Sequence, residues 1–482
     1  MSLFLKTCAL AVAVPLVFIG CTTTDPQAAF DGVNQTLSER TGTHLRWMRD
    51  EAAAAEMEQE VDGLLRTNLT AQSALAIALL NNRSLQAKFE EIGISQAELA
   101  QASRAQNPVI SANWRPPVGG RGVVNSDYGL TQNLLDLLIL PARKKIAASQ
   151  LDQVRGHIAQ QVLDFNQEVQ TAFYTFQALL QFANRLAVIV EVNEAAAEVA
   201  QRQFTAGNIN SLELRNQQLA FPQPPLALPR AQPQARTERE KVNRLLGLWG
   251  RQTVWQATEE LPPLPHEELS LADVEAAAVT RRFDLAAARN DVVAIAYAFN
   301  LKRSTRYLPG VDIGVSSERD VDGTWVLGPA LALEIPLFDQ GQPELAKLAA
   351  RYRQTRRQFE ALAVNIRSEV RAARDALLAA RDIATYSAQV LLPQNQQLLG
   401  EALLQYNAMQ MGNYDLLLAK QREQHAEQAT IEALRDYWIA RTRLQTALGG
   451  GFTPSLGSGA TTAVLSSAPS PSASRTSHEH QH

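Results

Sequence analysis

Two aromatic–acid pairs with identical spacing are the first residues whose chemistry stands out in the sequence. Phe204 precedes Glu213 by nine positions, and Tyr406 precedes Asp415 by nine positions. Each pair spans a glycine, which predicts a turn between two helices. An acid in the first turn of a helix is stabilised by the helix dipole. A carboxylate at a constriction also attracts cations and repels anions. Glu213 and Asp415 are compatible with both roles.

Methionine and histidine side chains supply a second set of candidate ligands. Met409 and Met411 lie inside the second aromatic–acid pair, and thioethers suit Cu(I). The commoner use of such methionines is adaptable apolar contact with a partner helix. Three alternating histidines, His478, His480 and His482, occupy the last five positions. They are candidate ligands for Cu(II), Ni(II) or Zn(II), or else part of a solvated tail without function.

The two cysteines, Cys8 and Cys21, both lie at the extreme N-terminus, which excludes a disulfide framework and a CxxC zinc or redox site. An apolar run over 9–19 behind a positive residue is typical of a secretory signal peptide. The segment 18–21 (FIGC) resembles the lipobox of bacterial lipoproteins, which implies cleavage before Cys21 and lipid attachment to its thiol. Thr22 stands where Asp usually retains a lipoprotein in the inner membrane, so the outer membrane is favoured. A plain signal peptide with a chance cysteine is the alternative.

Composition narrows the functional classes. The chain has 482 residues, 46% of them hydrophobic, and a net charge of −4, so neither a disordered chain nor a nucleic-acid partner is indicated. After residue 21 no stretch holds 18 uninterrupted apolar residues, which argues against a helical membrane span. No nucleophile–base pair, phosphate loop or metal triad stands out, so an enzyme is not indicated.

The helices and strands expected to position these residues occur in two copies along the sequence. Leu69-Thr70 opens one helical segment and Leu269-Ser270 opens another 200 residues later, with Thr70 and Ser270 as expected N-caps. In each copy a proline ends the helices, two short strand-like segments follow, and a long helix, a glycine-marked tip and a return helix complete the unit. The predicted strands lie at about 108–115, 125–135, 310–317 and 325–338.

The first long helix is predicted to begin near Ala142, and apolar residues recur at spacings of three and four from 162 to 190. About 65 residues make roughly 100 Å of helix, which requires coiled-coil packing against neighbours. The second copy is predicted from about 344 to 410, with a kink at Pro393. Five prolines between 222 and 233 predict a broken or extended segment over about 221–234.

These patterns divide the chain into six expected segments. They are a signal peptide (1–20), a lipid-anchored segment (21–65), the first repeat (66–250), a linker (251–268), the second repeat (269–449) and a tail (450–482) that is disordered by composition.

Four strands in one chain are too few for a membrane barrel, because the smallest such barrels have eight. The strands therefore form either a small soluble sheet or part of a sheet that several chains pool. Two chains would supply eight strands and three would supply twelve, and the arithmetic leaves the number open.

The repeated Leu-Thr/Ser opening, the segment 335–341 (IPLFDQG) and the tip from Tyr406 through Asp415-Leu416-Leu417 resemble the TolC family of outer-membrane efflux channels, over residues 65–450. The resemblance implies a mainly α fold with a small β part, whose long antiparallel coiled-coil helices form a periplasmic tunnel. It implies a homotrimer in which four strands per chain build a twelve-stranded outer-membrane β-barrel. It further implies docking to a periplasmic adaptor and an inner-membrane pump, contact with outer-membrane lipid, no catalytic residue, and no cofactor besides the lipid on Cys21.

The resemblance also implies a role for the tips. In the family they form the periplasmic gate, which here places Tyr406, Asp415, Glu213 and the aligned Phe204 at that gate. Where a glycine and then an arginine often stand, this chain has Met409 and Met411, so a salt-bridge lock built on that arginine is not expected.

The resulting hypothesis is a passive trimeric exit duct of a tripartite efflux system, with metal ions such as copper among the candidate substrates. The alternatives are the exit duct of a type I protein-secretion system and a structural periplasmic coiled-coil lipoprotein.

Overall fold

The computed structural model describes residues 25–450 except 117–118, 120–122, 220–223, 266–272, 309 and 321. Cys8, Cys21, the three C-terminal histidines and the expected N-cap Ser270 lie outside the described residues. Thr70 does cap the first helix of its repeat, because its Oγ1 accepts a hydrogen bond from Ser73 N at 3.2 Å.

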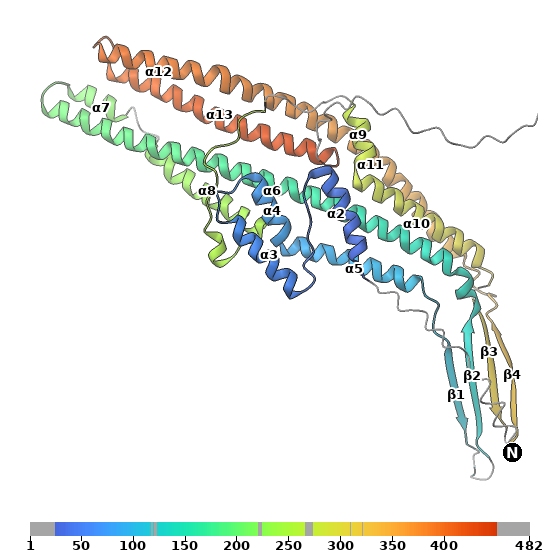
Figure 1. Cartoon of the computed structure of the whole chain (residues 1–482). Helices are drawn as coiled ribbons and strands as arrows, with labels where there is room; N and C mark the ends of the chain where they lie inside the picture. The colour runs from blue at the N-terminus through green and yellow to red at the C-terminus, as the bar shows by residue number, and fades with distance from the viewer. Residues whose placement is uncertain are drawn as a thin grey trace, which may run out of the picture. The chain divides into compact units, whose positions relative to one another are not determined.

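The same order of helices and strands occurs twice in the described chain (Figure 1). Two N-terminal helices, α2 (Gln27–Thr41) and α3 (Glu51–Leu64), come first. The first copy consists of α4 (Ala71–Asn81), α5 (Arg83–Ala102), β1 (Val109–Arg115), β2 (Asn125–Asn133), α6 (Leu134–Thr205), α7 (Ser211–Leu219) and α8 (Pro224–Leu246). The second consists of α9 (Val274–Arg281), α10 (Phe283–Thr305), β3 (Val311–Arg319), β4 (Trp325–Leu333), α11 (Gln342–Tyr386), α12 (Leu392–Asn407) and α13 (Asn413–Ala447). The predicted mainly α fold with a small β part is confirmed. None of the described helices has an apolar stretch long enough to cross a membrane.

The four strands form one antiparallel sheet in the order β1-β2-β3-β4, so β2 and β3 join the two repeats. Side chains support this junction, since Asn133 Nδ2 donates to Asp312 Oδ1 at 2.8 Å. The predicted extent of the fourth strand is wrong, because β4 ends at Leu333 rather than near 338. Pro336 has no N–H to offer a strand ladder, and the alternating apolar residues beyond Leu333 lie in irregular chain.

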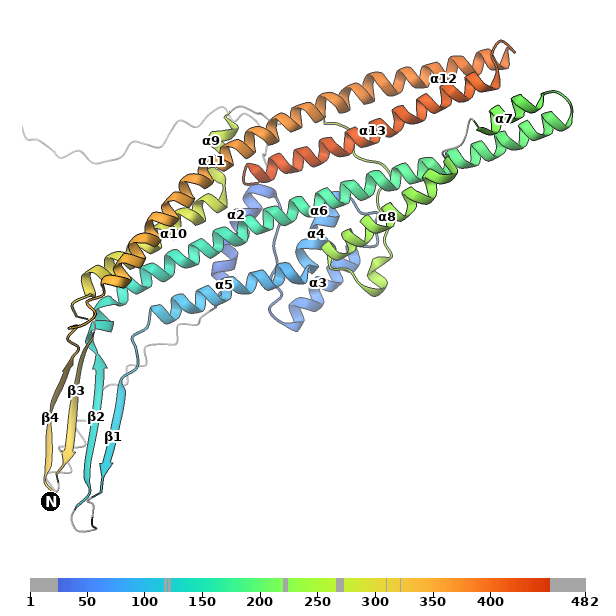
Figure 2. The same ribbon diagram turned by 180° about the vertical axis from the view of Figure 1, so that it is seen from behind.

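The long helix α6 is the central element of the helical part. It packs against α5 and α8 of its own repeat and against α10 and α13 of the other (Figure 2). The predicted apolar stripe is buried at Val162, Val169 and Phe173. At Gly156 the helices approach so closely that a Cβ would lie 3.0 Å from Ala287 Cβ of α10. The helix begins at Leu134, eight residues before the predicted start, because Asn133 Oδ1 caps it by accepting a hydrogen bond from Asp136 N at 2.7 Å.

The predicted kink near Pro393 is confirmed as a π-turn at Ser387–Leu391, between α11 and α12. Proline has no backbone N–H, so Pro393 removes one helical hydrogen bond from this part of the helix. Asn395 Nδ2 donates to Leu391 O at 2.8 Å, and Thr430 Oγ1 of α13 donates to Ser387 O at 3.3 Å. The kink is therefore held by the return helix as well as by the proline.

The prediction of a broken segment over 221–234 is wrong for its described part, because α8 is helical from Pro224. Pro229 and Pro233 lie four residues apart on the exposed face of the helix. Ala231 is buried in a cluster with Ala183 and Leu186 of α6. Packing against α6 therefore holds the chain helical despite the backbone hydrogen bonds that the prolines remove.

Candidate functional site: two helix tips and a polar cavity

The two predicted tips have the same backbone structure. The first joins α6 to α7 and the second joins α12 to α13. Gly207 N donates to Phe204 O at 2.9 Å, and Met409 N donates to Tyr406 O at 2.9 Å. One residue further on, each amide reaches back five positions, to Gln203 O and Gln405 O, again at 2.9 Å. The two turns therefore correspond residue by residue.

The side chains at equivalent tip positions are not equivalent. The turn places Gly207 at φ 79° and Met409 at φ 58°, both in the left-handed region. Glycine tolerates this region, whereas a side chain with a Cβ is strained there. The return helices also begin differently: Asn210 Oδ1 accepts a hydrogen bond from Glu213 N at 2.9 Å, and the equivalent Gly412 has no side chain to cap α13. The second tip thus lacks both stabilising features of the first.

The residues predicted for the gate lie in or beside these tips. Glu213 and Asp415 occupy the first turns of α7 and α13, and both are exposed. Tyr406 is half-buried, and Phe204 is 38% exposed. Among the side chains that the structure describes, no ion pair reaches either carboxylate. Both acids are therefore free to face solvent or a neighbouring chain.

The two methionines differ in exposure. Met409 is 95% exposed, and Met411 is half-buried. Within the described residues no group of three or more His, Cys, Asp or Glu could hold a metal ion. Sequence reasoning identified the methionines but missed that Met409 is strained. It also missed Asn210 as a cap, although an N-cap residue followed three positions later by Glu is a recognisable signal.

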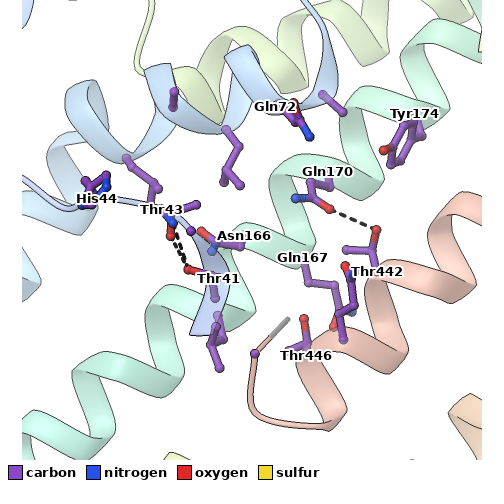
Figure 3. Close-up of a pocket in the computed structure, with 18 of the residues that line it drawn as sticks. Thr41, Thr43, His44, Gln72, Asn166, Gln167, Gln170, Tyr174, Thr442 and Thr446 are labelled. Carbon is purple, nitrogen blue, oxygen red and sulfur yellow. Dashed lines mark hydrogen bonds between the residues drawn. The ribbon is translucent and has the colours of Figure 1, made fainter. Parts of the chain in front are cut away.

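A polar cavity of about 730 Å³ lies away from the tips, between the segment 41–46, α4, α6 and α13 (Figure 3). Amide and hydroxyl side chains line it beside leucines and alanines of α4, and Thr442 Oγ1 donates to Gln170 Oε1 across it at 3.1 Å. Asn166 Oδ1 is buried and has no hydrogen-bond partner in the described part of the chain. Burial raises the pKa of Tyr174, which stacks on Trp438, to about 12. The N-terminal segment and the long helices thus enclose the cavity together.

Comparison with known proteins agrees with this architecture. No protein-family model matches the chain. The cobalt-zinc-cadmium resistance protein CzcC of Cupriavidus metallidurans is 21% identical over 394 residues, which cover 79% of this chain and 90% of the relative.

Solved structures show the same fold. The CmeC outer-membrane channel of Campylobacter jejuni superposes with a TM-score of 0.67 at 16% identity, covering 80% of this chain and 87% of that one. CusC, whose crystal structures concern transmembrane channel formation, superposes with a TM-score of 0.65 at 16% identity, covering 80% and 93%. With its duplicated order of helices and strands, the chain therefore has the fold of the TolC-like outer-membrane efflux channels.

Proposed function

We propose that the protein is the outer-membrane channel of a tripartite efflux system, a passive trimeric exit duct from the periplasm to the exterior. The observation that carries the proposal is the sheet. The strand register places apolar side chains from all four strands on one face of the sheet, and most of these side chains are exposed in the single chain. The exposed ones include Ile110, Trp114, Leu130, Val315, Trp325, Leu327 and Leu331.

An exposed apolar sheet face with two open edges is unstable in water. In lipid, every backbone hydrogen-bonding group must be paired, so the edges β1 and β4 cannot stay open. Three copies would pair the open edges, with β4 of one chain against β1 of the next. The same arrangement would turn the apolar face to lipid. The long helices of each chain would then line a duct that continues from the strands.

We further propose metal cations as the substrate class. The relative CzcC is named a cobalt-zinc-cadmium resistance protein. Three copies would bring six exposed carboxylates, from Glu213 and Asp415, to the tips, where they would favour cations. Met409 and Met411 would add thioether ligands that suit Cu(I). A periplasmic adaptor and an inner-membrane pump would deliver the ions, and the lipid proposed on Cys21 would anchor the chain to the outer membrane.

The channel is tested with purified protein in planar bilayers, with covalent cross-linking of the same sample. We expect trimers and a steady conductance. A protein that stays monomeric and conducts nothing contradicts the proposal and favours a structural role.

The substrate class is tested with a deletion strain exposed to cobalt, zinc, cadmium and copper salts beside a panel of organic drugs. We expect sensitivity to metals alone, restored by the intact gene. Sensitivity to drugs without metals contradicts the substrate class and leaves the channel intact. Mass spectrometry of the mature N-terminus tests the lipid on Cys21, and an unmodified cysteine rules it out.

A further inference from the structure

Positive charge is concentrated where the helices meet the strands. The segments 134–155, 297–308 and 333–357 hold twelve Lys and Arg but five Asp and Glu, in a chain whose net charge is −4. They contain the start of α6, the end of α10 and the start of α11. β2 and β4 run in the same direction and end at one edge of the sheet, where β3 begins, so the three helix ends meet there (Figure 1).

Seven of these cations form no ion pair with another described residue, and one of the seven, Arg306, lies over the Tyr307 ring instead. We call the other six the basic belt: Lys144 and Lys145 of α6, Lys302 and Arg303 of α10, and Arg351 and Arg353 of α11. All are exposed except the half-buried Lys302. Three of the five acids are engaged by other cations, since Asp136 pairs with Arg143, Asp152 pairs with Arg155, and Glu344 lies 3.8 Å from Lys347. No ion pair between described residues includes a belt residue.

Lys302 shows how closely the helix ends meet. A Cβ at Gly341, which precedes α11, would lie 3.2 Å from Lys302 Cε of α10. The helix dipole accounts for cations in the last turn of α10, but its influence fades within one turn. Lys144, Lys145, Arg351 and Arg353 lie beyond the second turn of helices that begin at this edge, where the dipole gives no reason for a cation.

An apolar rim separates the belt from the strands. It consists of Leu138, Ile335, Leu337 and Phe338, whose exposed fractions run from 66% to 102%. Leu138 lies five residues after the end of β2, and Ile335 lies two residues after the end of β4. Exposed apolar side chains beside long cationic ones are the arrangement found at a membrane surface, where the apolar groups enter the acyl region and the cations reach headgroups.

We propose that the basic belt binds the phosphate headgroups of anionic phospholipids, such as phosphatidylglycerol, in the leaflet that faces the helices. The inference rests on the proposed outer-membrane location of the strands. Each uncompensated Lys or Arg adds to the attraction of an anionic surface, and the belt lies close enough to the rim for several of its residues to act together.

The test is a competition between two lipids. Purified full-length protein in neutral detergent receives equal amounts of phosphatidylglycerol and phosphatidylcholine of the same chain length, and native mass spectrometry counts the retained lipids. We expect at least about a tenfold preference for phosphatidylglycerol. The combined variant Lys144→Gln, Lys145→Gln, Lys302→Gln and Arg303→Gln should reduce the ratio to near one.

A matched variant removes the same charge elsewhere: Arg66→Gln, Lys88→Gln, Arg230→Gln and Arg236→Gln. None of these four forms an ion pair with another described residue, and we expect the wild-type lipid ratio. Lys144→Arg with Lys145→Arg and Lys302→Arg keeps the charge and should keep the preference, which guards against a folding defect in the Gln variant.

Three outcomes overturn the proposal: an unchanged ratio in the belt variant, an equal loss in the matched variant, or displacement of the lipid by excess glycerol 3-phosphate, which would indicate a site for soluble phosphate. Conductance of the same samples separates this failure from failure of the proposed function. A conducting channel without lipid preference refutes the belt alone.

Discussion

The two helix tips share one backbone conformation but differ in the side chains that stabilise it. At the first tip, Gly207 occupies the left-handed position and Asn210 caps the return helix. At the second, Met409 occupies that position and Gly412 provides no cap. Because the hydrogen-bond pattern is the same, the difference lies in the side chains alone. The second tip is therefore expected to open more easily than the first.

The largest expected effect concerns what the tips share. Replacing both acids, Glu213→Gln and Asp415→Asn, should lower the cation-over-anion permeability ratio several-fold, because three chains would lose six carboxylates near one axis. Reversal potentials in planar bilayers measure the ratio. Each single variant should account for part of the change, and wild-type selectivity in the double variant would remove both acids from the gate.

The next effect transfers the strain to the first tip. Gly207→Met should cost about 1–2 kcal/mol locally, because a Cβ is unfavourable at φ 79°. Amide hydrogen exchange at the first tip should then accelerate by about five- to thirty-fold, approaching that of the second tip. Unchanged protection would mean that contacts beyond the turn hold the first tip closed.

The reverse change should relieve the second tip. Met409→Gly should stabilise the local structure by about 0.5–1 kcal/mol and slow exchange of the amides that follow it. Met411→Gly is the matched control, since Met411 has no positive φ and should gain nothing. If both variants protect the tip equally, strain at Met409 is not the cause of the difference.

The smallest effect concerns the caps. Asn210→Gly should weaken the start of α7 by a few tenths of a kcal/mol, and Gly412→Asn should strengthen the start of α13 by a similar amount. Gly412 has φ −78° and ψ 158°, which any residue adopts, so the added side chain brings no strain. Exchange of the Glu213 and Asp415 amides should shift in opposite directions, and shifts in the same direction would contradict the capping argument.

The sequence by itself determined the duplicated architecture, because the periodicities that predict strands and helices are local and can be read without knowledge of the fold. The alternation at 311–315 predicted β3, and the three-and-four spacing from Val162 predicted the buried stripe of α6. The nine-residue spacing also identified the tips. Pro393 predicted a kink because a missing N–H is a property of the residue itself.

Only the tertiary structure decided where packing overrides the local conformational preference of a residue. Packing on α6 holds α8 helical through Pro229 and Pro233, although helix propensity alone predicts a break at these prolines. The turn forces Met409 into a conformation that its side chain disfavours, because the helices on both sides dictate the backbone. The basic belt likewise emerges only when three helix ends, distant in the sequence, meet at one edge of the sheet. Such contacts are non-local, and no periodicity of a single segment encodes them.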